Sequence, residues 1–71
     1  MDGKRFGRRV RAFRKLKRLQ QTELAKRLKM STTTLGRIER GEKVPSEQLI
    51  SNIAQQLEIE QQGLIGEQIA E

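Results

Sequence analysis

The stretch that decides the fold runs from Gln21 to Pro45 and reads QTELAKRLKMSTTTLGRIERGEKVP. In its first part Leu24, Ala25 and Leu28 recur at helical spacing, which places them on one face of a helix. Two helical turns are long enough to hold all three residues. We therefore expect a short helix over residues 21–28 that buries one apolar stripe.

A tight turn at Lys29–Met30 separates this helix from the next one. Ser31 suits the N-cap of the next helix, because its hydroxyl can accept a hydrogen bond from a free N–H of the first turn. Leu35 and Ile38 give that helix an inward face, and Gly41 ends it. The stretch predicts two short helices joined by a turn, an arrangement that can place the second helix in a DNA groove.

Further helices are predicted on both sides of this stretch. An amphipathic helix is expected between Lys4 and Lys17, where the apolar residues at helical spacing are Phe6, Val10 and Phe13. Leu19 is placed to close the following junction. A fourth helix is expected after Pro45, with Ser46 as its cap and with the inward residues Ile50, Ile53, Ala54 and Leu57. A fifth is suggested by Ile59, Leu64, Ile65 and Ile69, although Gly63 and Gly66 each cost about 1 kcal/mol within a helix.

A chain of 71 residues suffices for one small domain with a thin core. It has no Cys and no His, so neither disulfides nor the common zinc ligands hold the fold. No apolar run approaches the roughly 20 residues that span a bilayer, and no signal-peptide core is present. We expect a compact all-α, five-helix domain over residues 1–71, located in the cytoplasm, without metal or cofactor. Its core should lie at about residues 4–60, and residues 61–71 should supply a fifth helix and a dimerisation or partner segment.

The charge is divided unevenly along the chain. Residues 1–43 hold all fifteen Lys and Arg and only four acidic residues, a balance of +11. Residues 44–71 hold five Glu and no Lys or Arg, a balance of −5. A small body with this polarity attracts a polyanion to one side. Nucleic acid is therefore favoured over the simpler interpretation that any short basic domain is merely soluble.

The predicted helix after Ser31 divides into an inner and an outer face. A helix in the major groove must bury one side and present the other to base edges, and the outer residues here are Thr32, Thr33, Gly36, Arg37 and Arg40. Arg can donate two hydrogen bonds to guanine, and Thr can bond a base or touch a thymine methyl. Thr32, Thr33 and Arg37 are the candidate base readers. Gly36 joins them if it lets the backbone approach DNA, and the alternative is a small residue without a role at an exposed site.

Phosphate contacts fix the register on DNA without reading its sequence. Gln21 begins a helix, where its backbone N–H and its side-chain amide are placed to meet one phosphate. Thr22 and Ser31 lie at helix starts as well, and Arg40 and Lys43 bracket the end of the candidate reading helix. These five residues are the candidate phosphate contacts. For Lys43 the competing interpretation is a solvated loop lysine, and most basic residues of the first helix are expected to form a wet face.

The spacing resembles the phage repressor and Cro type of helix-turn-helix, also called the xenobiotic-response-element family, over roughly residues 6–65. The matching residues are Phe6-Gly7, Val10, Phe13-Arg14, Leu19, Gln21, Leu24-Ala25, Ser31, Leu35, Ile38-Glu39, Gly41, Pro45, Ile53-Ala54, Leu57 and Ile59. The resemblance implies a five-helix DNA-binding domain, usually a dimer on a two-fold operator, in repressors, activators or antitoxins.

Carried over by position, the resemblance makes Gln21 a phosphate clamp, Arg40 a backbone contact, and Thr32, Thr33 and Arg37 base readers. It also makes Arg14 and Glu39 an ion pair that links the first and third helices; the alternative for Glu39 alone is an exposed carboxylate. Three positions depart from the family pattern. Arg18 and Lys29 stand where Gly is common, so positive φ angles there would cost stability, and Gln20 stands where a Ser or Thr cap is usual.

Other functions have less support. No nucleophile, general base or cofactor cradle is evident, which argues against an enzyme. The basic first helix could lie on an anionic membrane, but it lacks Trp and its Phe residues suit a core. Two Phe also make a poor stacking platform for single-stranded RNA. An antitoxin or protein-interaction module would use the acidic end, where Leu64, Ile65 and Ile69 could be exposed. We predict a sequence-specific regulator of transcription that binds double-stranded DNA as a homodimer, and we favour a repressor over an activator.

Overall fold

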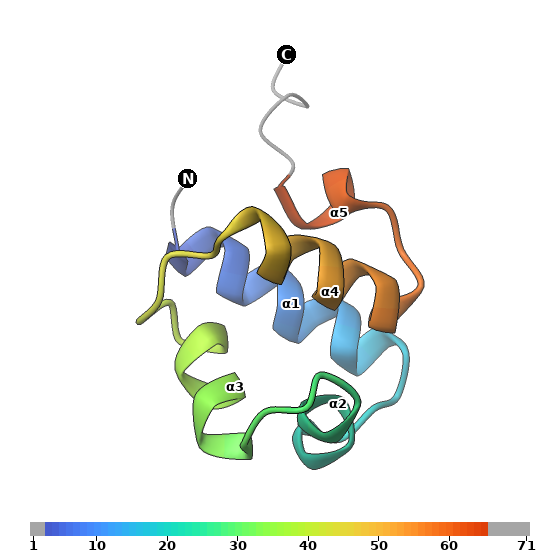
Figure 1. Cartoon of the computed structure of the whole chain (residues 1–71). Helices are drawn as coiled ribbons and strands as arrows, with labels where there is room; N and C mark the ends of the chain where they lie inside the picture. Colours follow the sequence, from blue (N-terminus) through green and yellow to red (C-terminus); the bar gives the residue numbers. More distant parts are fainter. Residues whose placement is uncertain (1–2, 66–71) are drawn as a thin grey trace.

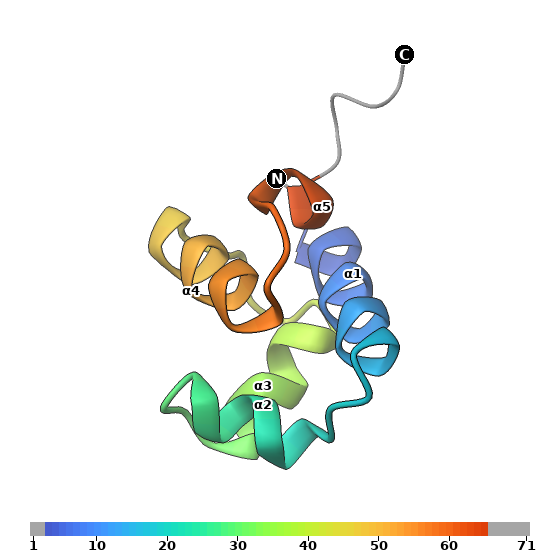
Figure 2. The same cartoon turned by 90° about the vertical axis from the view of Figure 1, so that its right-hand side faces the viewer.

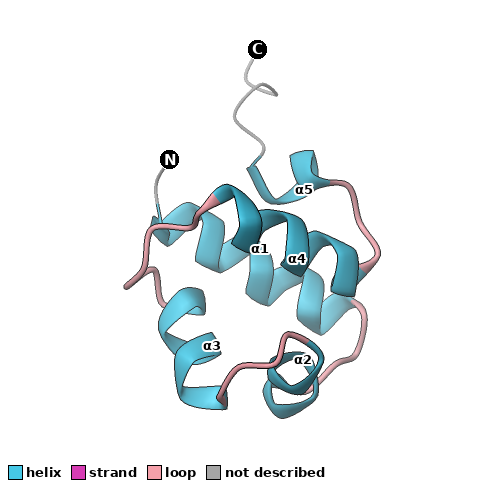
Figure 3. Ribbon diagram, viewed as in Figure 1, coloured by secondary structure: helices cyan, strands magenta, loops and turns pink. Residues whose placement is uncertain are grey.

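The computed structural model describes residues 3–65, which form five helices joined by short loops (Figures 1 and 3). The helices are α1 (Gly3–Leu16), α2 (Gln21–Arg27), α3 (Thr32–Glu39), α4 (Glu47–Leu57) and α5 (Gln61–Ile65). The all-α, five-helix prediction is confirmed, and each predicted helix is present. Gly66 and Ile69, which were assigned to the fifth helix, lie outside the described residues. None of these helices has the length and apolar character that crossing a bilayer requires.

Helix α1 is the centre of the packing. It contacts α3, α4 and α5, while α2 packs mainly on α3, and α5 on α4 as well. Figures 1 and 2 show α2 and α3 together at one end of the molecule and α5 at the opposite end. Helices α2 and α3, with the turn between them, therefore form one end of the molecule, and the other helices pack on their inner side.

The core is built from the apolar stripes that the sequence predicted. Its large, fully buried side chains come from all five helices: Phe6, Val10, Leu24, Leu35, Ile38, Ile53, Leu57 and Leu64. The expected core of residues 4–60 was too short, because Leu64 is completely buried. The suggestion that Leu64 is exposed for a partner is wrong for the same reason. Phe13 is only partly buried and packs near Gly63, where a side chain would approach its ring at 3.3 Å.

The helix starts follow the predicted capping. The Ser31 hydroxyl accepts a hydrogen bond from the Thr34 N–H at 3.0 Å, and the Ser46 hydroxyl accepts one from the Leu49 N–H at 3.1 Å. At the start of α2 the Glu23 carboxylate accepts the backbone N–H of Gln20 at 2.9 Å. Glu23 thus supplies one half of a capping box, which offsets part of the cost expected from the absence of a Ser or Thr.

Helices α1 to α4 all end in the same hydrogen-bonded motif. In each, two successive N–H groups beyond the helix reach back to carbonyls of the last turn, which requires a residue with positive φ. Only α3 uses glycine there, Gly41, with φ of 82°. The other three helices use Arg18, Lys29 and Glu58, with φ of 60°, 59° and 58°. The left-handed conformation costs a residue with a Cβ atom roughly 1–2 kcal/mol, so the structure holds strain at all three.

Gly7 permits a close crossing of α1 and α3. A Cβ atom at this position would clash with the backbone oxygen of Ile38 and would lie 2.6 Å from that of Glu39. Both oxygens belong to the end of α3, so a side chain on α1 would push the two helices apart. Gly7 therefore fixes how near α3 approaches its support.

Gly7→Ala is expected to destabilise the fold by about 1–3 kcal/mol, because overpacking must move the α3 backbone. Gly36→Ala is the matched control within a helix. Its Cβ would meet only the ends of two long side chains, Arg40 at 3.2 Å and Gln21 at 3.8 Å, so a gain of up to about 1 kcal/mol in helix propensity should dominate. Urea unfolding of the two variants measures the difference. Equal stability of the two would contradict the close crossing.

Lys29→Gly is expected to stabilise the fold by about 1 kcal/mol, because glycine adopts the positive φ of this position without strain. Lys29→Ala is the control, since it removes the same charge and keeps a Cβ atom. Thermal and urea unfolding should rank Lys29→Gly above both the parent and Lys29→Ala. If both variants gained stability equally, charge repulsion rather than backbone strain would be the cause.

Candidate nucleic-acid interface

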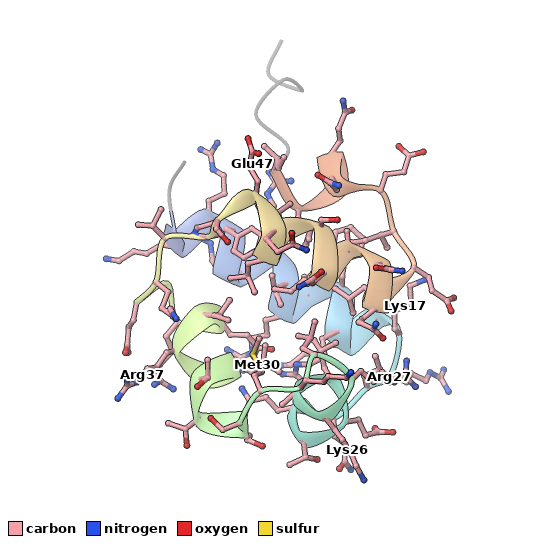
Figure 4. All side chains as sticks on the ribbon, viewed as in Figure 1. Lys17, Lys26, Arg27, Met30, Arg37 and Glu47 are labelled. Atoms are coloured by element: carbon pink, nitrogen blue, oxygen red, sulfur yellow. The ribbon has the colours of Figure 1, made fainter. Side chains whose placement is uncertain are left out.

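One face of α3 is open to solvent near its start. Leu35 and Ile38 are buried, whereas Thr32, Thr33 and Arg37 are exposed. Within residues 3–65 these three side chains make no hydrogen bond or ion pair to another residue. Figure 4 shows Arg37 pointing away from the body at the α2–α3 end. The three predicted base readers thus share an accessible surface with unused donors.

A buried ion pair links α3 to α1. Arg14 Nε donates to Glu39 Oε2 at 2.7 Å, and Arg14 Nη2 donates to Oε1 at 3.2 Å. The two side chains are only 11% and 4% exposed, so the pair is largely removed from water. Arg14 Nη1 also donates to the carbonyl of Leu19 at 2.9 Å. The structure brings together the two residues that the resemblance had linked, and it anchors the α1–α2 loop to the same guanidinium.

Gln21 completes this cluster from the third side. Its side-chain Nε2 donates to Glu39 Oε1 at 3.0 Å. The Glu39 carboxylate therefore accepts hydrogen bonds from α1 and α2 while it belongs to α3. Such bonds satisfy a buried carboxylate, which would otherwise be very costly. Among the described residues, no buried side-chain polar atom lacks a partner.

Gly36 is not on the exposed face. The expectation that it lies beside Arg37 on the outer side of α3 is wrong, because Gly36 is buried. The Arg40 guanidinium and the Gln21 amide lie over it, near the position that a Cβ atom would take. These two side chains, at 3.2 Å for Arg40 Nη1 and 3.8 Å for Gln21 Nε2, shield Gly36 from solvent. It is therefore removed from the base-reading set.

The remaining phosphate candidates lie around α3, and none of them is buried. Thr22 is exposed in the first turn of α2, and Lys43 is exposed in the loop after α3. The Ser31 hydroxyl is already used, since it caps α3 and donates to Thr34 Oγ1 at 2.9 Å. Arg40 makes a solvent-exposed ion pair with Glu42 at 2.8 Å.

The Glu42 carboxylate adjusts the charge at this edge. The hydrogen bond from Arg40, together with the charge of that guanidinium, lowers the pKa of Glu42 below its ordinary value. Glu42 is therefore ionised at neutral pH and neutralises part of the Arg40 charge.

Residues 3–65 contain no group of acidic, His or Cys side chains that could hold a metal ion. Figure 4 places the acidic Glu47 on α4, at the end opposite Lys26.

Sequence reasoning missed two features of this region. It assigned Gln21 to phosphate only and did not foresee its bond to Glu39, which depends on how α2 and α3 cross. It also left Arg11 among the charges of a wet face, although Arg11 lines a hollow with Arg14, Gln21 and Arg40. No local signal distinguishes Arg11 from its basic neighbours in α1.

A family model described as a helix-turn-helix domain matches residues 5–65, and the chain belongs to this family. The phage repressor and Cro type resemblance drawn from the sequence is confirmed. The chain is 48% identical over 59 residues to an uncharacterised HTH-type transcriptional regulator, YazB, of Bacillus subtilis, covering 83% of this chain and 86% of that protein. It is also 48% identical over 54 residues to the ImmF control region 10 kDa protein of Bacillus phage phi105, covering 76% of this chain and 60% of that protein.

Two solved structures share the fold. The restriction-modification controller protein C.AhdI from Aeromonas hydrophila is 35% identical, with a TM-score of 0.82 over 89% of this chain and 96% of its own. The clp gene regulator ClgR from Corynebacterium glutamicum is 26% identical, with a TM-score of 0.87 over 92% of this chain and 84% of its own. The relatives that these comparisons name are regulators and control-region proteins.

Glu39→Gln is expected to lower the free energy of unfolding by about 3–5 kcal/mol, because it leaves the buried Arg14 without a counter-charge. Adding Arg14→Met to Glu39→Gln should recover at least about 1 kcal/mol, because neither side chain of the double variant then buries a charge. The amide oxygen that Glu39→Gln introduces can still accept the hydrogen bond from Gln21. The exposed pair serves as the control: Arg40→Met with Glu42→Gln should show little coupling. A double-mutant cycle in urea measures both pairs. Independent effects of Arg14 and Glu39 would contradict the buried ion pair.

Proposed function

We propose that this chain is a sequence-specific double-stranded DNA-binding regulator of transcription whose α3 enters the major groove. The observation that carries the proposal is the division of α3. Its inner face is locked by Leu35, Ile38 and the buried Glu39, while Thr32, Thr33 and Arg37 stay exposed with unused donors. A helix held this firmly from behind can present side chains to base edges in one register.

The exposed residues suit base reading by their chemistry. Arg37 has the planar donor fork that matches O6 and N7 of guanine. Thr32 and Thr33 can bond base edges through their hydroxyls or pack their methyl groups on thymine. We assign these three as base readers. In this role they discriminate sequence, whereas neighbouring basic residues add affinity without preference.

We assign phosphate contacts to residues that surround α3. Gln21 keeps one amide hydrogen after its bond to Glu39, and Thr22 stands exposed beside it. Arg40 lies near the Gln21 amide over Gly36, and its Nη groups can meet a phosphate while Nε stays bonded to Glu42. Lys43 stands exposed in the loop after α3. The Ser31 hydroxyl is already bonded to Thr34. We therefore assign Ser31 a phosphate contact only through its position at the start of α3. Such contacts fix the register of α3 in the groove.

We further propose that the chain acts as a homodimer and as a repressor. Two copies related by a two-fold axis would place their α3 helices in successive major grooves, about 34 Å apart. The burial of Leu64 leaves Ile65 as the partly exposed apolar residue of α5 available to a partner. Repression requires only that a protein occupy its DNA site, and a DNA-binding domain can do that by itself. The named regulators among the relatives support a role in gene control.

Selection from a random duplex library is the test of this function. The parent chain is expected to enrich one two-fold symmetric sequence. Arg37→Ala should weaken binding to that sequence by about 1–3 kcal/mol and relax the preference at one base pair. Arg27→Ala is the matched control, because Arg27 lies in the last turn of α2, and Figure 4 shows it on the opposite side of the α2–α3 end from Arg37. An unchanged profile for Arg37→Ala would remove its role as reader, and enrichment of asymmetric single sites would contradict the homodimer.

A further inference from the structure

A hollow of about 390 Å³ opens between α1, α2 and α3, beside the exposed face of α3. Each of the three helices contributes lining residues, and so does Arg40, the C-cap of α3. Its lining residues are Arg11, Arg14, Gln21, Gly36, Glu39 and Arg40. Gly36 leaves this space open, because any Cβ there would extend toward Arg40 Nη1, 3.2 Å away.

The hollow is electropositive. Three arginines line it against one carboxylate, and that carboxylate is already bound by Arg14 and Gln21. The charges of Arg11 and Arg40 are therefore not balanced by any acidic residue of the lining. Arg40 has an exposed partner outside it, Glu42. An anion is the ligand that such a lining favours.

Donors without partners point to the same ligand. Arg11 makes no hydrogen bond or ion pair with any residue between 3 and 65. The Gln21 amide has two hydrogens and gives one to Glu39, so the second remains. Arg40 uses only Nε for Glu42, which leaves its Nη groups for another acceptor. Three separate side chains thus have N–H groups to give to one acceptor with several oxygens.

We propose that Arg11 supplies a further ligand, from α1, to the DNA-backbone phosphate assigned above to Gln21 and Arg40, and that this phosphate enters the hollow. The proposal rests on the DNA-binding function proposed above. A helix seated in the major groove is flanked by sugar-phosphate backbone, and Gly36 lies at the helix flank next to Arg37, so the backbone is the anion that approaches the hollow. Arg11 would then extend the interface onto α1, which is otherwise a supporting helix.

The salt dependence of binding to the selected duplex tests the role of Arg11. Arg11→Ala should reduce the slope of log K against log salt by about 0.9, the value for one phosphate, and should leave the selected sequence unchanged. Arg11→Lys should keep the slope. Arg5→Ala is the matched control, because Arg5 is exposed and lies about 120° around α1 from Arg11. Equal slopes for Arg11→Ala and Arg5→Ala overturn the proposal.

Single methylphosphonate substitutions in the same duplex identify the source of the phosphate. At one position, neutralising the backbone should weaken binding of the parent but not of Arg11→Ala. If no position shows this coupling, while inorganic phosphate at constant ionic strength gives a saturable shift of the Gly36 amide, the hollow binds the free anion and the proposal is overturned. A parent that selects no sequence overturns the proposed function as well, whereas a parent that selects a site with Arg11 uncoupled overturns this inference alone.

Discussion

The rest of the structure depends on the burial of one carboxylate, that of Glu39. A charge removed from water is tolerated only when its partners are complete, and here those partners come from α1 and α2. A rotation or shift of α3 that separated Glu39 from Arg14 would leave a charge unmatched, and one that separated it from Gln21 would leave a hydrogen bond unmade. The apolar core holds α3 against the body, and this polar cluster selects one position among those that the core alone would permit.

The same cluster connects packing to chemistry. Gln21 bonds Glu39 with one amide hydrogen and keeps the other, so a single side chain both positions α3 and faces the proposed DNA backbone. Gly7 sets the distance between α1 and α3, and Gly36 opens the space between α3 and Arg40. Arg18 and Lys29 hold strained backbone where glycine would be easier, and they add positive charge around the helix-turn-helix.

Local patterns predicted the five helices, the Ser31 and Ser46 caps and most of the core, because each depends on neighbours within one or two turns. Features that depend on how helices cross were beyond the sequence. Gly36 was placed on the outer face from its spacing, yet the side chains of Gln21 and Arg40 cover it. Leu64 follows a glycine in a five-residue helix, and only packing on α1 and α4 explains its burial. The Arg14–Glu39 link came from a family resemblance, since residues 25 positions apart carry no local signal.

The most direct test of this account is an amide chemical-shift map of the chain titrated with its selected duplex. The largest changes should fall on Thr32, Thr33 and Arg37 of α3, with further changes at Gly36 and Gln21 and small ones in α4. Because Glu39 fixes α3 in place, the helix should keep its hydrogen-bonding pattern in the complex. Largest changes on α4 or on the outer face of α1, with α3 unaffected, would contradict the central claim that α3 is a DNA-reading helix held by a buried carboxylate.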